Sequence, residues 1–175
     1  MNKIILLLFS VLCLMGRAQG NSEWKMCVVS DVHLMAPELL KSDGKAFQDY
    51  LSSDRKLLGE SVEIMDSITN RLLAEHPKVL LVTGDLTKDG ENVSHQYLVD
   101  HFLSKLRRSG VRVFVVPGNH DVNNPHAVVF DGDKTRRTTT VSPSEFASVY
   151  ADYGYRQALA RDAASLSYVA QLASG

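Results

Sequence analysis

The chain has 175 residues, of which 45% are hydrophobic, and its 19 Lys and Arg residues nearly balance 20 Asp and Glu residues. This is the composition of a globular protein, and it excludes a disordered, collagen-like or coiled-coil chain. The balanced charge provides no strongly basic surface, so we expect neither a nucleic-acid-binding patch nor electrostatic recruitment to an acidic membrane.

The first twenty residues have the pattern of a secretory signal peptide. Met1 and Lys3 give a positive start, residues 4–15 are almost entirely apolar, and small residues follow. The apolar run is too short for a membrane-spanning helix, which needs about 20 residues. Leu12 precedes Cys13 where a lipid-attachment signal carries a small residue, so we do not expect a lipid anchor. We therefore expect export to the periplasm or the medium, with residues 1–20 removed and residues 21–175 retained. The alternative is a buried N-terminal strand.

Three short apolar runs predict buried β-strands, at residues 25–30, 78–83 and 111–116. Their residues are mostly β-branched or otherwise apolar and do not alternate with polar residues. This is typical of strands that are covered on both faces. Cys27 lies within the first run and is interpreted as a small core residue rather than a nucleophile.

Two helices are predicted between these strands. Apolar residues recur at helical spacing over residues 57–72 and again over residues 93–106. Pro77 ends the first helical pattern and Gly110 ends the second. The order strand, helix, strand, helix, strand predicts an α/β fold with three N-terminal parallel strands and crossover helices.

The remainder of the chain is less regular. Residues 122–140 show no clear period and predict a long loop. Ser142-Pro143-Ser144-Glu145 is a capping box and predicts a helix whose buried stripe includes Phe146, Val149, Tyr150 and Tyr153, with Gly154 as its terminator. Residues 165–170 predict the opening of another strand.

A polar cluster follows each of the three predicted strands. The clusters are Asp-Val-His at residues 31–33, Gly-Asp-Leu-Thr-Lys-Asp-Gly at 84–90 and Gly-Asn-His-Asp at 118–121. Each alone is also explained by a turn or a helix cap. Because ligands bind beyond the carboxyl ends of parallel strands, all three in order indicate one shared site. Oxygen and nitrogen donors without a thiolate favour a hard-to-borderline metal ion.

The spacing within these clusters suits a metal site. Asp31 and His33 are two residues apart, so their side chains point the same way if the strand continues. Gly84 and Gly118 permit sharp turns. A carboxylate can bridge two cations, whereas the neutral amide of Asn119 offers one oxygen to one cation.

These motifs resemble those of the calcineurin-like metallophosphoesterases. The family pattern is D-x-H, G-D, G-N-H-D/E, a lone His and then G-H-x-H, and this chain supplies the first three over about residues 25–121. The resemblance implies a partial α/β/β/α sandwich that lacks its C-terminal sheet. The runs at residues 30–34 and 84–91 look like those of the cyclic-nucleotide-phosphodiesterase-like branch.

The resemblance also implies a set of metal ligands. Asp31 and His33 would bind a first metal ion, Asp85 would bridge two divalent ions, and Asn119 would bind the second. Mn, Fe and Zn all accept these ligands.

Other polar residues of the motifs would act without binding metal. The resemblance implies that His120 faces the substrate phosphate and assists the leaving group, and that Asp121 orients His120. For Asp89 we expect a helix-capping role near Glu91 instead of a ligand role.

The family pattern then stops, since no Gly-His-x-His occurs. We interpret residues 21–175 as the N-terminal part of a calcineurin-like domain. Among the remaining histidines, we expect His76, His95 and His101 at solvated or core-edge positions, and His126 lies in the predicted long loop with a substrate role open.

Two functions from different classes follow. The first is hydrolysis of a small-molecule phosphoester by water that two metal ions activate. The alternative is an exported non-catalytic module that binds metal or phosphate through an incomplete metal centre. Arg136 and Arg137 suit phosphate contact, or they form a solvated pair. A glycine-rich nucleotide-binding motif is absent from the sequence.

Overall fold

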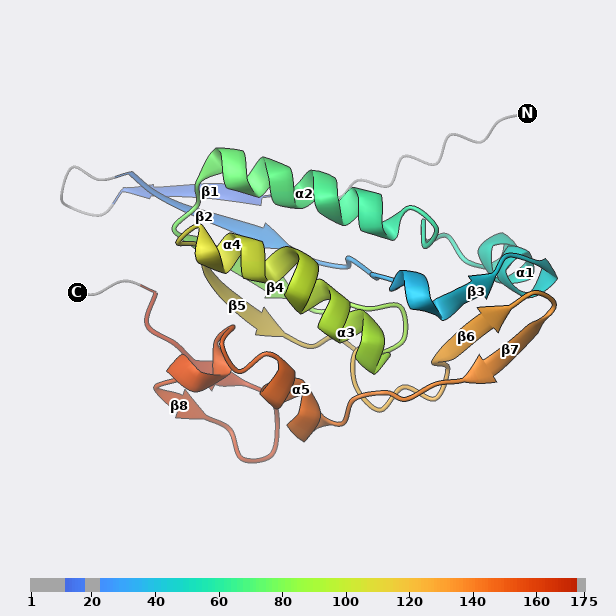
Figure 1. The fold of residues 1–175 in the computed structure, drawn as a ribbon. Coiled ribbons are helices and arrows are strands. Elements are labelled where there is room, and N and C mark those ends of the chain that lie inside the picture. The colour runs from blue at the N-terminus through green and yellow to red at the C-terminus, as the bar shows by residue number, and fades with distance from the viewer. Residues whose placement is uncertain (1–11, 18–22, 173–175) are drawn as a thin grey trace.

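The structure is a computed structural model that describes residues 12–17 and 23–172 (Figure 1). Of the predicted signal peptide, residues 1–11 and 18–20 lie outside the described residues. Its remaining part, Leu12–Arg17, forms strand β1, which pairs antiparallel with β2. Removal of residues 1–20 and export of the chain therefore stay predictions.

A four-stranded sheet in the order β1-β2-β4-β5 forms the centre of the fold. Three of its strands are mutually parallel neighbours, as predicted: β2 (Glu23–Val29), β4 (Val79–Thr83) and β5 (Arg112–Val116). The predicted α/β class with crossover helices is confirmed. Cys27 is completely buried, as expected of a core residue.

Helices cover one face of this sheet (Figure 1). They are α2 (Ser61–Glu75) and a continuous helical segment composed of α3 (Asn92–Leu98), the π-helical turn η2 (Val99–Leu103) and α4 (Ser104–Arg108). Met65 and Leu72 of α2 pack in the same core as Leu80 of β4, and each such buried side chain stabilises the fold by about 1.5–3 kcal/mol. The periodic apolar stripes of the sequence therefore face the sheet.

His95 departs from the expectation of a solvated or core-edge position. Its side chain is fully buried in α3. Nδ1 lies 2.8 Å from the Tyr150 hydroxyl oxygen, and Nε2 lies 2.9 Å from the backbone oxygen of Asp121. Because both ring nitrogens have partners, the polar ring can be buried.

The predicted long loop over residues 122–140 is wrong in its centre, which is a β-hairpin. Strand β6 (Val128–Asp131) pairs antiparallel with β7 (Lys134–Arg137). Gly132 begins the two-residue turn with φ of +61°, a conformation that glycine adopts at no steric cost. A Gly-Asp pair between two short runs was the sequence signal for this hairpin.

The hairpin belongs to a small lobe beside the main sheet. The lobe also contains η1 (Pro37–Leu39), β3 (Leu40–Ser42) and α1 (Lys45–Ser53), and β3 pairs parallel with β6. Its core, separate from the main one, is formed by Met35, Leu39, Phe47, Leu58 and Phe130. The right-hand side of Figure 1 shows this lobe next to the carboxyl ends of β2 and β4.

The last part of the chain begins with the predicted capping box. Helix α5 (Pro143–Val149) starts after Ser142, whose side chain accepts a hydrogen bond from the Glu145 backbone. It ends at Val149, so Tyr153 and the predicted terminator Gly154 lie beyond it. The elements that follow are η3 (Tyr155–Gln157), β8 (Ala160–Arg161) and β9 (Tyr168–Val169), so the predicted strand at residues 165–170 shortens to two residues. Within the described ranges, no helix is both long and apolar enough to cross a bilayer.

Candidate metal centre

The first two polar clusters lie side by side because their backbones continue the parallel pairing beyond the strand ends. The amide of Asp31 donates to the Gly84 carbonyl at 3.1 Å, and the amide of His33 donates to the Asp85 carbonyl at 2.9 Å. These bonds hold the two loops in register, so their side chains reach the same region.

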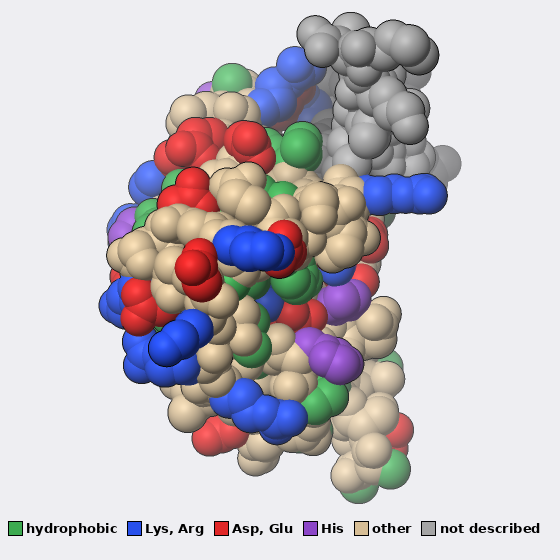
Figure 2. All heavy atoms as spheres, turned by 90° about the vertical axis from the view of Figure 1, so that its right-hand side faces the viewer, with side chains coloured by type: hydrophobic (Ala, Val, Ile, Leu, Met, Phe, Trp, Pro, Cys, Tyr) green, Lys and Arg blue, Asp and Glu red, His purple; other side chains and the backbone are tan. Residues whose placement is uncertain are grey.

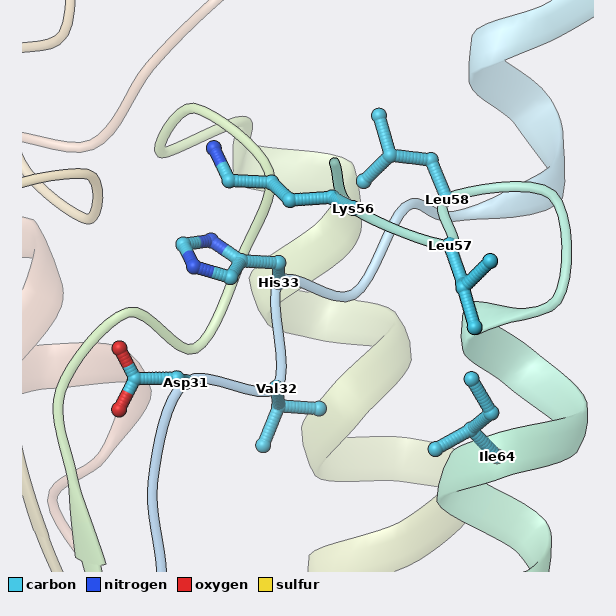
Figure 3. Close-up of a pocket in the computed structure, with 7 residues that line it drawn as sticks. All are labelled: Asp31, Val32, His33, Lys56, Leu57, Leu58 and Ile64. Atoms are coloured by element: carbon cyan, nitrogen blue, oxygen red, sulfur yellow. The ribbon is translucent and has the colours of Figure 1, made fainter. Parts of the chain in front are cut away.

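The backbone is strained at the same positions. Asp31, His33 and Asp85 adopt φ values of 57°, 45° and 48°, in the left-handed region that L-residues rarely enter. Such conformations cost on the order of 1–3 kcal/mol each and cluster at functional sites. In Figure 3, the side chains of Asp31 and His33 point to the same side while Val32 points the opposite way. The sequence predicted a shared direction for a continuing strand, whereas β2 ends at Val29 and the direction occurs here with a left-handed backbone at Asp31 and His33.

Two glycines allow contact between the loop at residues 84–90, called the second loop, and the loop at residues 118–121, called the third loop. A Cβ atom added at Gly118 would collide with the Asp85 carboxylate, and one added at Gly84 would lie 2.9 Å from the Gly118 Cα atom. The amide of His120 donates to Asp85 Oδ1 at 3.0 Å. Glycine at residues 84 and 118 therefore places Asp85 against the third loop.

The result is a cluster of three side chains from three loops. Ligand atoms of His33, Asp85 and His120 all lie within 4.8 Å of one another. The His33 and His120 rings meet edge to face, with centroids 5.0 Å apart. Asp31 lies beside His33 and is exposed, outside this trio, and Asn119 is exposed on the third loop.

The electrostatics of His33 favour a metal ligand. Burial lowers the pKa of its imidazole, and the Lys56 ammonium lowers the pKa further against the opposing effect of Asp85. The ring is therefore neutral near pH 7, the form that binds metal. Figure 3 shows Lys56 extending over His33 on the side to which Asp31 points.

The residues present fit a divalent cation. His33 Nδ1 is buried and has no hydrogen-bond partner. His33 Nε2 lies 3.9 Å from Asp85 Oδ2, which is too long for a hydrogen bond. Two ligand bonds of about 2.0–2.2 Å to one shared cation span such a gap. The carboxylate and imidazole donors suit Mn, Fe or Zn.

Asp121 has a different role from the predicted one. Its buried carboxylate accepts from the backbone amides of Leu86, Thr87 and Gly118 at 3.1, 3.0 and 2.8 Å, and also from the Thr87 hydroxyl at 3.0 Å. It fastens the second loop to the third and does not contact the His120 ring. An acidic residue is needed here because several buried donors converge on one point.

Asp89 orients His120 instead, which corrects the predicted capping role. His120 Nδ1 lies 3.1 Å from Asp89 Oδ1 and 2.8 Å from the backbone oxygen of Lys88. Because a carbonyl and a carboxylate only accept, Nδ1 carries the proton and Nε2 is left for another partner. No spacing rule signalled this contact, which joins residues 31 positions apart.

The other candidate residues lie away from this cluster. His76, His101 and His126 are exposed, and Arg136 and Arg137 are exposed on β7, where Arg136 pairs with Asp131 at 3.3 Å. Positive and negative side chains are interspersed on the face shown in Figure 2, in keeping with the balanced charge of the chain.

A parallel α/β fold with carboxylate and imidazole groups gathered at the ends of its strands is the arrangement of a metal-binding enzyme of the α/β class. The family profile described as calcineurin-like phosphoesterase matches residues 25–164, and the chain belongs to this family. A search of curated proteins finds no match. Membership supports a metal-dependent phosphoesterase activity, and this family uses divalent metals.

Proposed function

We propose that this chain carries part of a two-metal centre that hydrolyses small-molecule phosphoesters. The observation that supports this most directly is that two of the proposed ligands, His33 and Asp85, lie within 4.8 Å of each other and of His120 at the ends of parallel strands. Family membership supports the reaction class. The number of ions, their identity as Mn, Fe or Zn, and the ligand assignments are part of the proposal.

Four side chains would hold the ions. Asp31 and His33 would bind the first ion, Asp85 would bridge both, and Asn119 would bind the second. When bound, such ions stabilise charge on the phosphoryl oxygens and lower the pKa of water. The chain contributes a neutral His33 imidazole and the strained turns that set the ligand positions before any ion arrives.

His120 would act on the substrate. Its Nδ1 proton is held by Asp89 and the Lys88 carbonyl, which leaves Nε2 for the substrate, and the ring lies edge to face with His33. A proton donated from Nε2 would neutralise the leaving oxygen as the phosphoester bond breaks. Asp89 would stabilise the positive charge that His120 carries before that transfer.

The narrower parts of the proposal rest on the sequence. The runs at residues 30–34 and 84–91 support placement near the cyclic-nucleotide-phosphodiesterase-like branch. The pattern of residues 1–20 supports export, which would remove β1. The absent Gly-His-x-His supports residues 21–175 as the N-terminal part of a longer domain.

The test measures hydrolysis by the full-length product of the reading frame. p-Nitrophenyl phosphate and bis-p-nitrophenyl phosphate are assayed with Mn²⁺, Fe²⁺ or Zn²⁺, together with metal content. Asp85→Ala should abolish both turnover and metal binding, whereas Asp66→Ala, on the exposed side of α2, should change neither. Unchanged turnover in Asp85→Ala would refute the proposed centre.

A non-catalytic binding module is the second candidate. It is favoured by the absence of the Gly-His-x-His pattern from the sequence. This candidate predicts metal or phosphate binding by the full-length protein without turnover of either substrate, and with the same loss in Asp85→Ala.

A further inference from the structure

Lys88 is a fully buried lysine beside the candidate centre. Its side chain has 0% exposure, and Nζ lies 2.5 Å from Asp89 Oδ2 and 2.9 Å from Glu91 Oε1. Nζ also lies over the rings of Tyr50 and Phe130, at 5.2 and 5.7 Å from their centroids. A buried ammonium is retained only where several groups compensate for its lost hydration, as these do.

Both ends of Lys88 act on His120. The backbone oxygen of Lys88 accepts from His120 Nδ1 at 2.8 Å. The ammonium holds Asp89 through Oδ2, which leaves Oδ1 facing the same His120 nitrogen at 3.1 Å. Tyr50 of α1 and Phe130 of β6 set the place of the ammonium, so the small lobe supports this arrangement.

We propose that Lys88 is a positioning residue for His120, acting through Asp89. This inference rests on the proposed role of His120 in leaving-group departure. Without the ammonium, the buried carboxylates of Asp89 and Glu91 both lose the cation that they share. Asp89 is then no longer held through Oδ2, so its carboxylate turns further toward the Asn124 amide, which already donates to Oδ1 at 3.3 Å, and the His120 ring loses a partner.

The test substitutes Lys88→Met, which removes the charge and keeps the length of the side chain. Lys105→Met is the matched control, since Lys105 also lies over an aromatic ring and near a carboxylate, but on α4. In ¹H–¹⁵N spectra of this chain, the His120 Nδ1 proton should be observed for the wild type and the control. In Lys88→Met its exchange with water should be at least about tenfold faster.

Turnover by the full-length protein supplies a readout that a general loss of stability would not move. Phenolate needs a proton to leave, whereas p-nitrophenolate does not. Lys88→Met should therefore lose at least about tenfold more kcat on phenyl phosphate than on p-nitrophenyl phosphate, and Lys105→Met should lose neither.

Each result decides one question. An unchanged Nδ1 proton, or equal losses on both esters, would overturn the role of Lys88. An inactive wild type with Lys88-dependent Nδ1 protection would reject the proposed function and retain the positioning contact. If Lys88→Met does not fold, Lys88→Met/Glu91→Gln removes the excess buried charge, and the same two readouts apply.

Discussion

Replacing Asp121 by Ala should remove the hydrogen bonds that join the loop at residues 84–90 to the loop at residues 118–121, and so lower the free energy of unfolding. The carboxylate receives four hydrogen bonds, three of them from backbone amides that would be left without their partner. Each stranded donor costs about 1–3 kcal/mol, and water entering the gap recovers part of this. We therefore expect a loss of about 3–5 kcal/mol, the range measured when one partner of a buried charged contact is removed.

The assay is urea unfolding of the metal-free chain, followed by thermal melting. A loss of this size lowers the midpoint by on the order of 10 °C for a chain of this length. Asp121→Asn keeps the shape and one acceptor and should lose less than Ala. Asp100→Ala, at an exposed position of η2, is the control and should stay within about 0.5 kcal/mol of the wild type. A loss below about 1 kcal/mol for Asp121→Ala would show that this carboxylate does not join the loops.

Three further outcomes are expected. Gly118→Ala places a methyl group against the Asp85 carboxylate, so Mn²⁺ affinity measured by competition titration should fall by at least about tenfold while the far-ultraviolet spectrum is retained. Unchanged affinity would contradict the proposed ligand role of Asp85. Burial lowers the pKa of the His95 imidazole, although the nearby acidic groups Asp121 and Glu91 oppose this effect. As the pH falls, His95 is therefore protonated in the unfolded chain at a higher pH than in the folded chain, and the free energy of unfolding should decline below about pH 6.5. His95→Gln should flatten this decline in melting temperature and the exposed His101→Gln should not; equal slopes would rule out His95 as a source. Added Mn²⁺ at 100 times its dissociation constant should stabilise the chain by about 2.7 kcal/mol, reversibly with a chelator, and an unchanged melting temperature would argue against a metal site.

The local sequence determined the three parallel strands of the sheet and the edge of the sheet at which the candidate site lies. The runs at residues 25–30, 78–83 and 111–116 consist mainly of apolar residues that do not alternate with polar ones, which is typical of parallel strands in an α/β sheet. The polar clusters follow these strands directly, so parallel pairing alone brings them to one edge. The sequence also predicted a sharp turn at Gly84, which has a φ of +87°. At Gly118 the structure gives another reason for glycine, since Asp85 leaves no room for a Cβ atom.

Tertiary structure alone decided which groups meet within that site. Asp89 reaches His120 across 31 positions, and the buried ammonium of Lys88 depends on rings from α1 and β6. His95 lies in a helix whose sequence pattern also fits a surface position, and its contacts with the Tyr150 hydroxyl and the Asp121 backbone oxygen permit its burial. Such contacts join distant segments through side-chain direction and desolvation, which local periodicity does not encode. The local sequence therefore specifies the edge of the sheet at which the polar side chains lie. The packing of distant segments specifies which nitrogen and which oxygen atoms contact each other.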